Sequence, residues 1–91
     1  MTLQKQLESH HVFPCEFMFK ALGENSMEFV TRVTQALPPA LGRTCEVRVE
    51  TRTSSLGNHV AITLHVFVES SHEVLRIYEA LHATEGVRYV L

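Results

Sequence analysis

Three segments of the chain alternate apolar and polar residues, as strands with one buried face do, and a fourth strand is expected at the end of the chain. In residues 45–53, CEVRVETRT, the odd-numbered residues are apolar or hydroxylic and the even-numbered ones are Glu and Arg. In residues 59–68, HVAITLHVFV, five aliphatic side chains share one face. We predict two further strands, one at 15–22 that stops at Gly23 and one in the terminal VRYVL, 87–91.

A segment with helical spacing follows the first predicted strand. The apolar residues of ENSMEFVTRVTQALPPALG fall within one arc of a helical wheel, and the polar residues occupy the opposite side. Asn25 is the predicted N-cap, and Glu28 completes a capping-box pattern. Because Pro38 and Pro39 lack the amide hydrogens that a helix interior needs, we expect this helix to end near Leu37.

A second helix is predicted in ESSHEVLRIYEALHATEG. Ser70 and Glu73 form another capping-box pattern, and Gly86 is the natural end of the segment. The order β-α-β-β-α-β predicts an α+β, ferredoxin-like split βαβ fold, in which two helices cover one face of a four-stranded antiparallel sheet. We assign residues 13–91 to this single domain and residues 1–12 to a polar N-terminal tail.

The charged strand 45–53 is an edge strand in this topology, with its odd-numbered residues in the core and its charges on the open face of the sheet. Two interpretations stay open: the charges keep the face hydrated and deter aggregation, or they form part of a docking surface. The apolar residues expected at the centre of the face are Met18, Leu22, Phe67 and Val90. The charged residues expected around them are Lys20, Arg48, Glu50, Arg52 and Arg88. Because apolar patches with charged rims are typical of protein interfaces, the candidate interface residues are Met18, Leu22, Arg48, Arg52, Phe67 and Arg88.

The composition argues against two classes of partner. The chain has 8 Lys and Arg against 10 Asp and Glu and no basic cluster, which disfavours nucleic acids. RNA-binding versions of this fold also need stacking aromatic residues on the open faces of the central strands, where Phe67 and His65 are too few. No apolar run is long enough to cross a membrane, and the start of the chain lacks the apolar core of a signal peptide. We therefore expect a soluble, cytoplasmic protein.

No catalytic or metal-binding set stands out in the sequence. His59 and His65 share one face of a strand but lie roughly 20 Å apart at the rise of a strand, too far for one metal ion. Glu24 lies in the loop after the first strand, where an acylphosphatase-like enzyme of this fold would need an Arg. Cys15 and Cys45 are predicted to be reduced thiols that face the core, and a Cys15–Cys45 disulfide is the alternative. We predict no enzyme activity, no metal and no cofactor.

Several stretches resemble the YbeD family of small bacterial proteins: FPCEFMFKALG, SSLGNHVAITLHV, IYEAL and the terminal GVRYVL. The similarity covers nearly all of 13–91. The turn between the second and third strands departs from the family pattern: Leu56 stands where relatives frequently have Lys, His59 where Tyr is common, and Ala61 at a small hydroxyl position. These differences remove polar groups from the turn and argue against an anion site there.

The resemblance implies a βαββαβ fold without an established enzymatic activity, similar to the ACT-type regulatory domains that bind amino acids, and a link with lipoate metabolism. In ACT domains the effector lies between the first strand's loop and the first helix, often at a dimer interface. The matching residues here are Gly23, Glu24, Asn25 and Ser26. We therefore predict a non-catalytic binding or regulatory module that acts through protein contacts on the open face or an edge strand. The alternative is a sensor of an amino acid or a lipoate-pathway compound, and a homodimer stays open.

Overall fold

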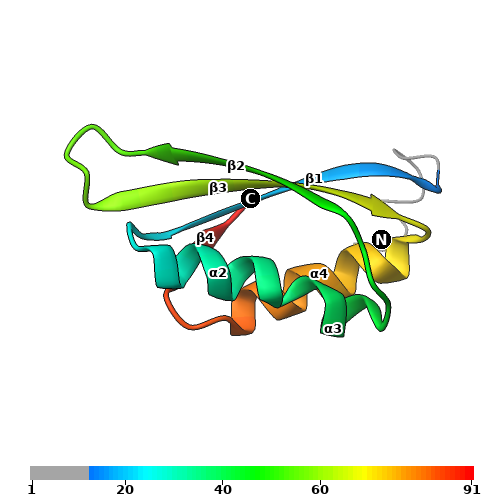
Figure 1. The fold of residues 1–91 in the computed structure, drawn as a ribbon. Helices are drawn as coiled ribbons and strands as arrows, with labels where there is room; N and C mark the ends of the chain where they lie inside the picture. The colour runs from blue at the N-terminus through cyan, green and yellow to red at the C-terminus, as the bar shows by residue number, and fades with distance from the viewer. Residues whose placement is uncertain (1–12) are drawn as a thin grey trace, which may run out of the picture.

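The computed structural model describes residues 13–91, so the predicted tail at 1–12 lies outside the described residues. The four strands are β1 (Cys15–Glu24), β2 (Val47–Thr53), β3 (His59–Val68) and β4 (Val87–Val90). They form one antiparallel sheet in the order β2-β3-β1-β4. The helices α2 (Met27–Gln35), α3 (Leu37–Leu41) and α4 (Ser71–Ala83) all lie on one side of the sheet (Figure 1). The ferredoxin-like fold predicted from the sequence is confirmed.

The core lies between the sheet and the helices and follows the alternation of the strands. The side chains of Phe19 and Ala21 in β1 are fully buried, and so are those of alternate residues in β3 from Ile62 to Val68. They pack against helix residues that share the same burial, namely Phe29, Val33, Leu37, Val74, Ile77 and Leu81. No helix of residues 13–91 lies on the opposite side of the sheet (Figure 1), because each helix has only one apolar stripe to bury.

Three strands differ in extent from the sequence prediction, and the smallest difference is in β4, which ends at Val90 rather than Leu91. β1 does not stop at Gly23 but continues to Glu24, which pairs with His59. β2 begins at Val47 rather than Cys45. Cys45, Val47 and Val49 pack against the core, as their parity predicts, but Thr51 and Thr53 are exposed. The β2–β3 hairpin extends past the helix layer (Figure 1), so nothing covers the outer end of β2.

The N-cap of α2 is Ser26, and the predicted cap at Asn25 is wrong. Ser26 has extended backbone angles, and its hydroxyl accepts a hydrogen bond of 3.1 Å from the amide of Phe29. Asn25 instead holds the β2–β3 turn: its side-chain amide donates to the carbonyl of Gly57 at 3.0 Å, and its backbone amide donates to the carbonyl of Asn58. Asn25 therefore binds a turn 32 residues away instead of capping α2.

The two prolines do not end the helical segment in the way that was predicted. α2 ends at Gln35, but a second short helix, α3, follows from Leu37 and contains both prolines in its first turn. The first turn is where missing amide hydrogens cost nothing, because those amides have no partner within a helix. Gly42 ends α3 with a left-handed φ of 70°. Residues 38–39 were expected to end the helix, whereas in the structure they lie in the first turn of the next one.

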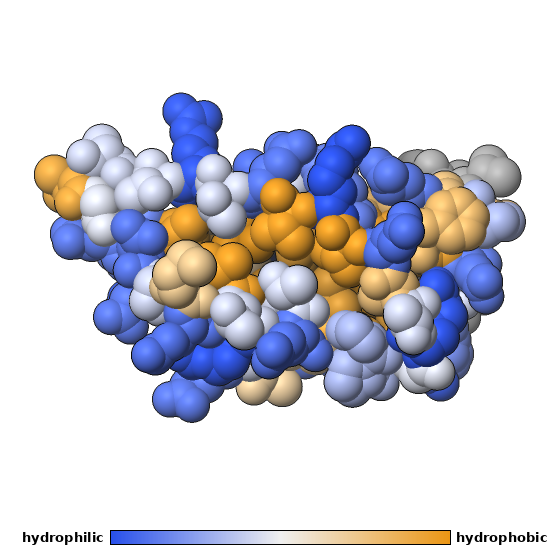
Figure 2. All heavy atoms as spheres, in the orientation of Figure 1, coloured by the Kyte–Doolittle hydropathy of each residue, from blue (hydrophilic) through white to orange (hydrophobic). Residues whose placement is uncertain are grey.

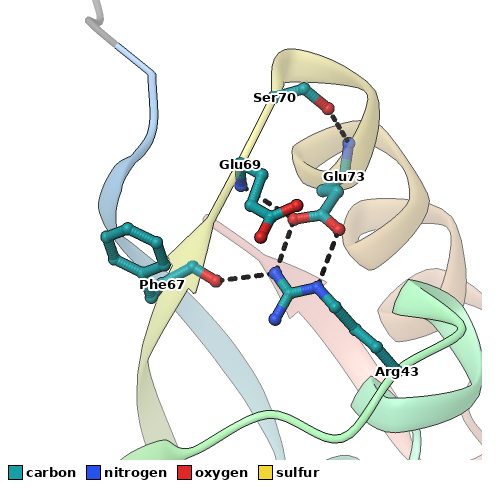
Figure 3. A network of polar contacts seen from close by, with 5 residues as sticks. All are labelled: Arg43, Phe67, Glu69, Ser70 and Glu73. Carbon is teal, nitrogen blue, oxygen red and sulfur yellow. Dashed lines mark hydrogen bonds and ion pairs between the residues drawn. The ribbon is translucent and has the colours of Figure 1, made fainter.

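Ser70 caps α4 as predicted, but Glu73 does not complete the capping box with Ser70 (Figure 3). The Glu73 carboxylate accepts two hydrogen bonds from the Arg43 guanidinium, at 2.7 and 3.1 Å, and one from the amide of Glu69 at 2.8 Å. Arg43 also donates to the carbonyl of Phe67 at 3.1 Å. The pair therefore ties the segment before β2 to the end of β3 and the start of α4.

This pairing changes the acidity of the groups involved. Hydrogen bonds from Arg43 lower the pKa of the Glu73 carboxyl, an effect that partial burial opposes and the Glu69 amide reinforces. The same hydrogen bonds raise the pKa of Arg43. Nearby, burial raises the pKa of the Cys45 thiol. Both cysteines are free, as the sequence predicts, and each is only half-buried.

The Glu73 carboxylate gives the fold a pH dependence that can be tested with the Glu73→Gln variant. Because the folded-state pKa of Glu73 lies below the ordinary value of 4.5, the ionised group stabilises the fold above that pH. The contribution is lost as the pH falls through the folded-state pKa. We expect Glu73→Gln to have a lower free energy of unfolding than the wild type at pH 7, and the difference to shrink below pH 4.5. Denaturant titrations at several pH values measure both quantities.

Glu79→Gln, on the exposed side of the same helix, controls for the loss of one negative charge. A Glu73→Gln difference that stays constant from neutral to acidic pH would contradict the stabilising role of the ionised pair.

Candidate functional site on the open sheet face

The side of the sheet opposite the helices is the candidate site, and we call it the open face. The register aligns its residues in rows across the strands, because paired residues of antiparallel strands point to the same side. One row joins Arg48, His65 and Met18. Two rows further along the open face, another row joins Arg52, Ala61, Leu22 and Tyr89. The open face therefore combines side chains from all four strands.

A network of charged side chains surrounds His65 on the open face. The His65 side chain is only 14% exposed, and its two ring nitrogens lie 3.6 Å from a Glu16 oxygen and 3.5 Å from a Glu50 oxygen. Arg48 lies 3.7 and 3.9 Å from the same two carboxylates. The Nε2 atom of His65 is buried without a hydrogen-bond partner among residues 13–91. Because Glu16, Arg48 and Glu50 are well exposed, these ion pairs orient side chains rather than contribute much stability.

Large apolar side chains are exposed around this network. Met18 is 57% exposed, Phe67 52%, Tyr89 67% and Leu91 68%. Leu22 is half-buried beside Tyr89. The sequence placed Val90 in this group, which is wrong: Val90 pairs with Ala21 and packs against the core. Tyr89 and Leu91 occupy the open face in its place, and the sequence prediction missed both.

A β-bulge explains the error in the last strand. The register of β4 against β1 shifts between Leu22 and Gly23, so that Arg88 is the extra residue. The bulge lets Val87 and Val90 both pack against the core, although they are three residues apart. Strict alternation would have placed them on opposite sides of the sheet. Arg88 remains exposed and borders a hollow on the open face.

The open face is hollowed at both ends. Near the β2–β3 turn, a hollow of about 330 Å³ is lined by Leu22, Arg52, Thr53, Ser54, Ser55, His59, Val60 and Ala61. An adjoining one is lined by Leu22, His59, Arg88 and Tyr89. At the other end, a hollow of about 620 Å³ is lined by Glu16, Glu46, Val47, Arg48, His65 and Phe67. The six candidate interface residues thus fall into two groups: Leu22, Arg52 and Arg88 at the turn end, and Met18, Arg48 and Phe67 at the other.

The two ends of the open face differ in charge. Arg52 and Arg88 at the turn end make no ion pair with any other residue in 13–91, and neither does Lys20, which lies one row nearer the centre, in line with Thr63 and Glu50. Around His65, by contrast, the Glu16 and Glu50 carboxylates already have Arg48 as a counter-ion. Unpaired guanidinium groups beside exposed apolar side chains are suited to a ligand or partner with carboxylates and apolar groups.

The loop proposed as an alternative ligand site is occupied by contacts within the protein. Gly23 is buried beneath the Phe29 ring, and a methyl group there would collide with that ring and lie 2.5 Å from the carbonyl oxygen of Gly86. Asn25 binds the β2–β3 turn and Ser26 caps α2. The groups of this loop therefore hold the fold together.

Two further properties bear on function. Within 13–91, no group of three or more His, Cys, Asp or Glu side chains is arranged to hold a metal ion. None of the helices in the described part of the chain is long and apolar enough to cross a membrane. The arrangement on the open face offers charges and apolar contacts for binding.

Comparison with known proteins identifies the family. Residues 8–91 match the family described as "Protein of unknown function (DUF493)". The chain belongs to the DUF493 family. Its relatives include a UPF0250 protein of Neisseria gonorrhoeae, 36% identical over all of both chains. A UPF0250 protein of Shewanella sediminis is 34% identical over 87% of this chain and 88% of the relative. The family resemblance inferred from the sequence is confirmed.

Solved structures share the fold of this DUF493 protein at low sequence identity. The solution structure of protein HP0495 from H. pylori matches with a TM-score of 0.72 and 14% identity, over 89% of this chain and 85% of that one. The ACT domain of a GTP pyrophosphokinase from Chlorobium tepidum matches with a TM-score of 0.63 and 15% identity, over 85% and 97%. The fold is therefore that of ACT domains as well as ferredoxin-like.

The packing of Gly23 predicts that Gly23→Ala destabilises the protein by about 1–3 kcal/mol, as overpacking of a close contact does. The free energy of unfolding from denaturant titration measures the effect. In the Gly23→Ala/Phe29→Leu double variant, the smaller side chain removes part of the collision, so we expect a double-mutant cycle with a favourable coupling energy. Stability of Gly23→Ala equal to that of the wild type would contradict this packing.

Proposed function

We propose that this DUF493 protein is a non-catalytic binding or regulatory module that acts through protein contacts, chiefly on its open face. The observation that supports the proposal is the group of exposed large apolar side chains, Met18, Phe67, Tyr89 and Leu91, on the side of the sheet opposite the helices of residues 13–91 (Figure 1). Isolated exposed apolar residues are ordinary on small proteins. Several that share one hollowed face, bordered by charges, are typical of a partner surface.

The charges on the open face suggest the chemistry of the partner. Arg52 and Arg88 make no ion pair with any other residue in 13–91, so a partner that presents Asp or Glu at the turn end would supply an acidic counterpart. Phe67 and Met18 at the other end would contact apolar side chains of the partner. The proposal places this module in the cytoplasm, where the half-buried thiols of Cys15 and Cys45 stay reduced.

The Phe67→Glu variant tests the open face. We expect a protein partner captured from native cells by the wild type to bind this variant at least about tenfold more weakly, because a buried aromatic contact often carries much of the binding energy of an interface. Binding of the purified partner, measured by calorimetry, gives the affinity. Phe67 is 52% exposed, so the melting temperature should stay close to that of the wild type.

Met27→Glu is the matched control for that experiment. Met27 is 82% exposed at the start of α2, on the helix side, and the substitution introduces the same charge. Partner affinity should be unchanged in this variant. Equal losses in Phe67→Glu and Met27→Glu, or no loss in Phe67→Glu, would count against the open face as the binding surface.

A small-molecule sensor is the second candidate function, favoured by the likeness to the ACT domain of a GTP pyrophosphokinase. Its site would be at Gly23, Glu24, Asn25 and Ser26, next to the amide groups of Met27 and Glu28, which have no acceptor within 13–91. A thermal-shift screen with amino acids and lipoate-related compounds separates the two functions. A saturable rise in melting temperature with one compound would support the sensor, since a ligand that binds only the folded state stabilises it.

A further inference from the structure

We propose that two copies of this chain pair antiparallel along β2, about a two-fold axis at Val49, and so form a continuous eight-stranded sheet. The inference rests on the proposed function as a protein-binding module, and it names a second copy of the chain as the partner of the edge strand. It uses the edge of the sheet, and it leaves both open faces uncovered, on the same side of the joined sheet.

β2 has the free backbone groups that such pairing requires. Among the residues that the structure describes it is bonded only to β3, and its other side is an edge of the sheet. The amide of Ser54 donates to the carbonyl of His59, so the even-numbered residues of this strand direct their backbone groups toward β3. The N–H and C=O groups of Val47, Val49 and Thr51 therefore point away from the sheet, because successive residues of a strand alternate in this direction.

The charges of β2 are complementary to their own copy in one register. With Val49 opposite Val49 of the second copy, Glu46 faces Arg52 and Arg48 faces Glu50, and the two-fold axis repeats both pairs. All four charged side chains of the segment 46–52 then oppose a charge of the other sign. A strand with only charges of one sign, which is how many edges avoid association, would repel its copy in every register.

Neighbouring registers are disfavoured by the same charges. Backbone bonding allows the register to change only in steps that keep odd-numbered residues opposite each other. The nearest step in one direction places Arg48 opposite Arg48 and Glu46 opposite Glu50 of the second copy. The nearest step in the other direction places Glu50 opposite Glu50 and Arg48 opposite Arg52. Like charges directly opposite are destabilising, so the alternating pattern selects the Val49 register.

The geometry also favours contact between the charges. In the Val49 register the odd-numbered residues form the hydrogen-bonded pairs and the even-numbered ones form the non-hydrogen-bonded pairs, whose side chains lie closer together. Arg48 and Glu50 are 65% and 63% exposed, and the contact between them within one chain is long, at 3.9 Å, so both can turn toward a second chain.

An apolar band beneath β2 would be covered by the pairing. Seen from the side on which β2 runs, apolar side chains are exposed between the sheet and the helices (Figure 2). Val47 and Val49 are half-buried against the core, and their outer sides remain accessible. A second copy placed along this edge removes them from water, which favours association.

A charge reversal and its compensation test the pairing. We expect the wild-type protein to sediment as a dimer in analytical ultracentrifugation at high micromolar concentration. E50R places two positive charges opposite each other at both symmetric positions, so its dimer should dissociate at concentrations about tenfold lower or cease to form. R48E/E50R restores both opposite-charge pairs with unchanged composition, and its dimer should have nearly the wild-type dissociation constant.

Recovery in R48E/E50R excludes misfolding as the reason for loss in E50R. A wild type that is monomeric at every concentration, or a dimer that E50R does not weaken, overturns the inference. So does failure of R48E/E50R to recover. F67E changes the open face outside this strand and should dimerise as the wild type does. Partner binding by F67E therefore tests the proposed function, and dimerisation of E50R tests the pairing along β2. Either of the two can be refuted without the other.

Discussion

The pairing of β1 with β3 along their whole length is the constraint on which the rest of the structure depends. Ten consecutive residue pairs, from Cys15 with Val68 to Glu24 with His59, join the two central strands. This register decides which residue of each strand faces the helices. Phe19 and Leu64 meet in the core on one side, and Met18 and His65 meet on the other. A shift by one residue would exchange the core with the open face.

Close packing at one corner of the molecule connects this central pair to the first helix and the last strand. Gly23 allows the Phe29 ring to lie on the backbone of β1, and Gly86, with a φ of 95°, turns the chain into β4 beside the same ring. The bulge at Arg88 follows directly and lets Val87 and Val90 both reach the core. The same bulge turns Tyr89 and Arg88 toward the open face. The composition of the candidate site is therefore a consequence of how the corner packs.

The charged residues of β2 serve two surfaces at once. Their side chains lie on the open face, where Arg48 and Glu50 surround His65. Their strand is also the edge of the sheet, where their order along the chain would govern pairing with a copy. These roles are compatible, because pairing along the edge leaves the open face accessible. A module of this kind would present two copies of its binding face side by side on one sheet.

The sequence by itself determined the fold class, the strand order and most of the open face, because alternation with period two and helical spacing are local properties that burial of one face imposes. Met18, Leu22, Arg48, Arg52 and Phe67 lie where their parity placed them. Tertiary structure alone decided the features that depend on contacts between distant residues. Asn25 binds a turn 32 residues away, and Arg43 binds Glu73 30 residues away. Likewise, the bulge that exchanges Val90 for Tyr89 arises only where β4 packs against β1. Such contacts leave no periodic pattern in the sequence. Each joins a single side chain or backbone position to a surface that exists only after the chain has folded.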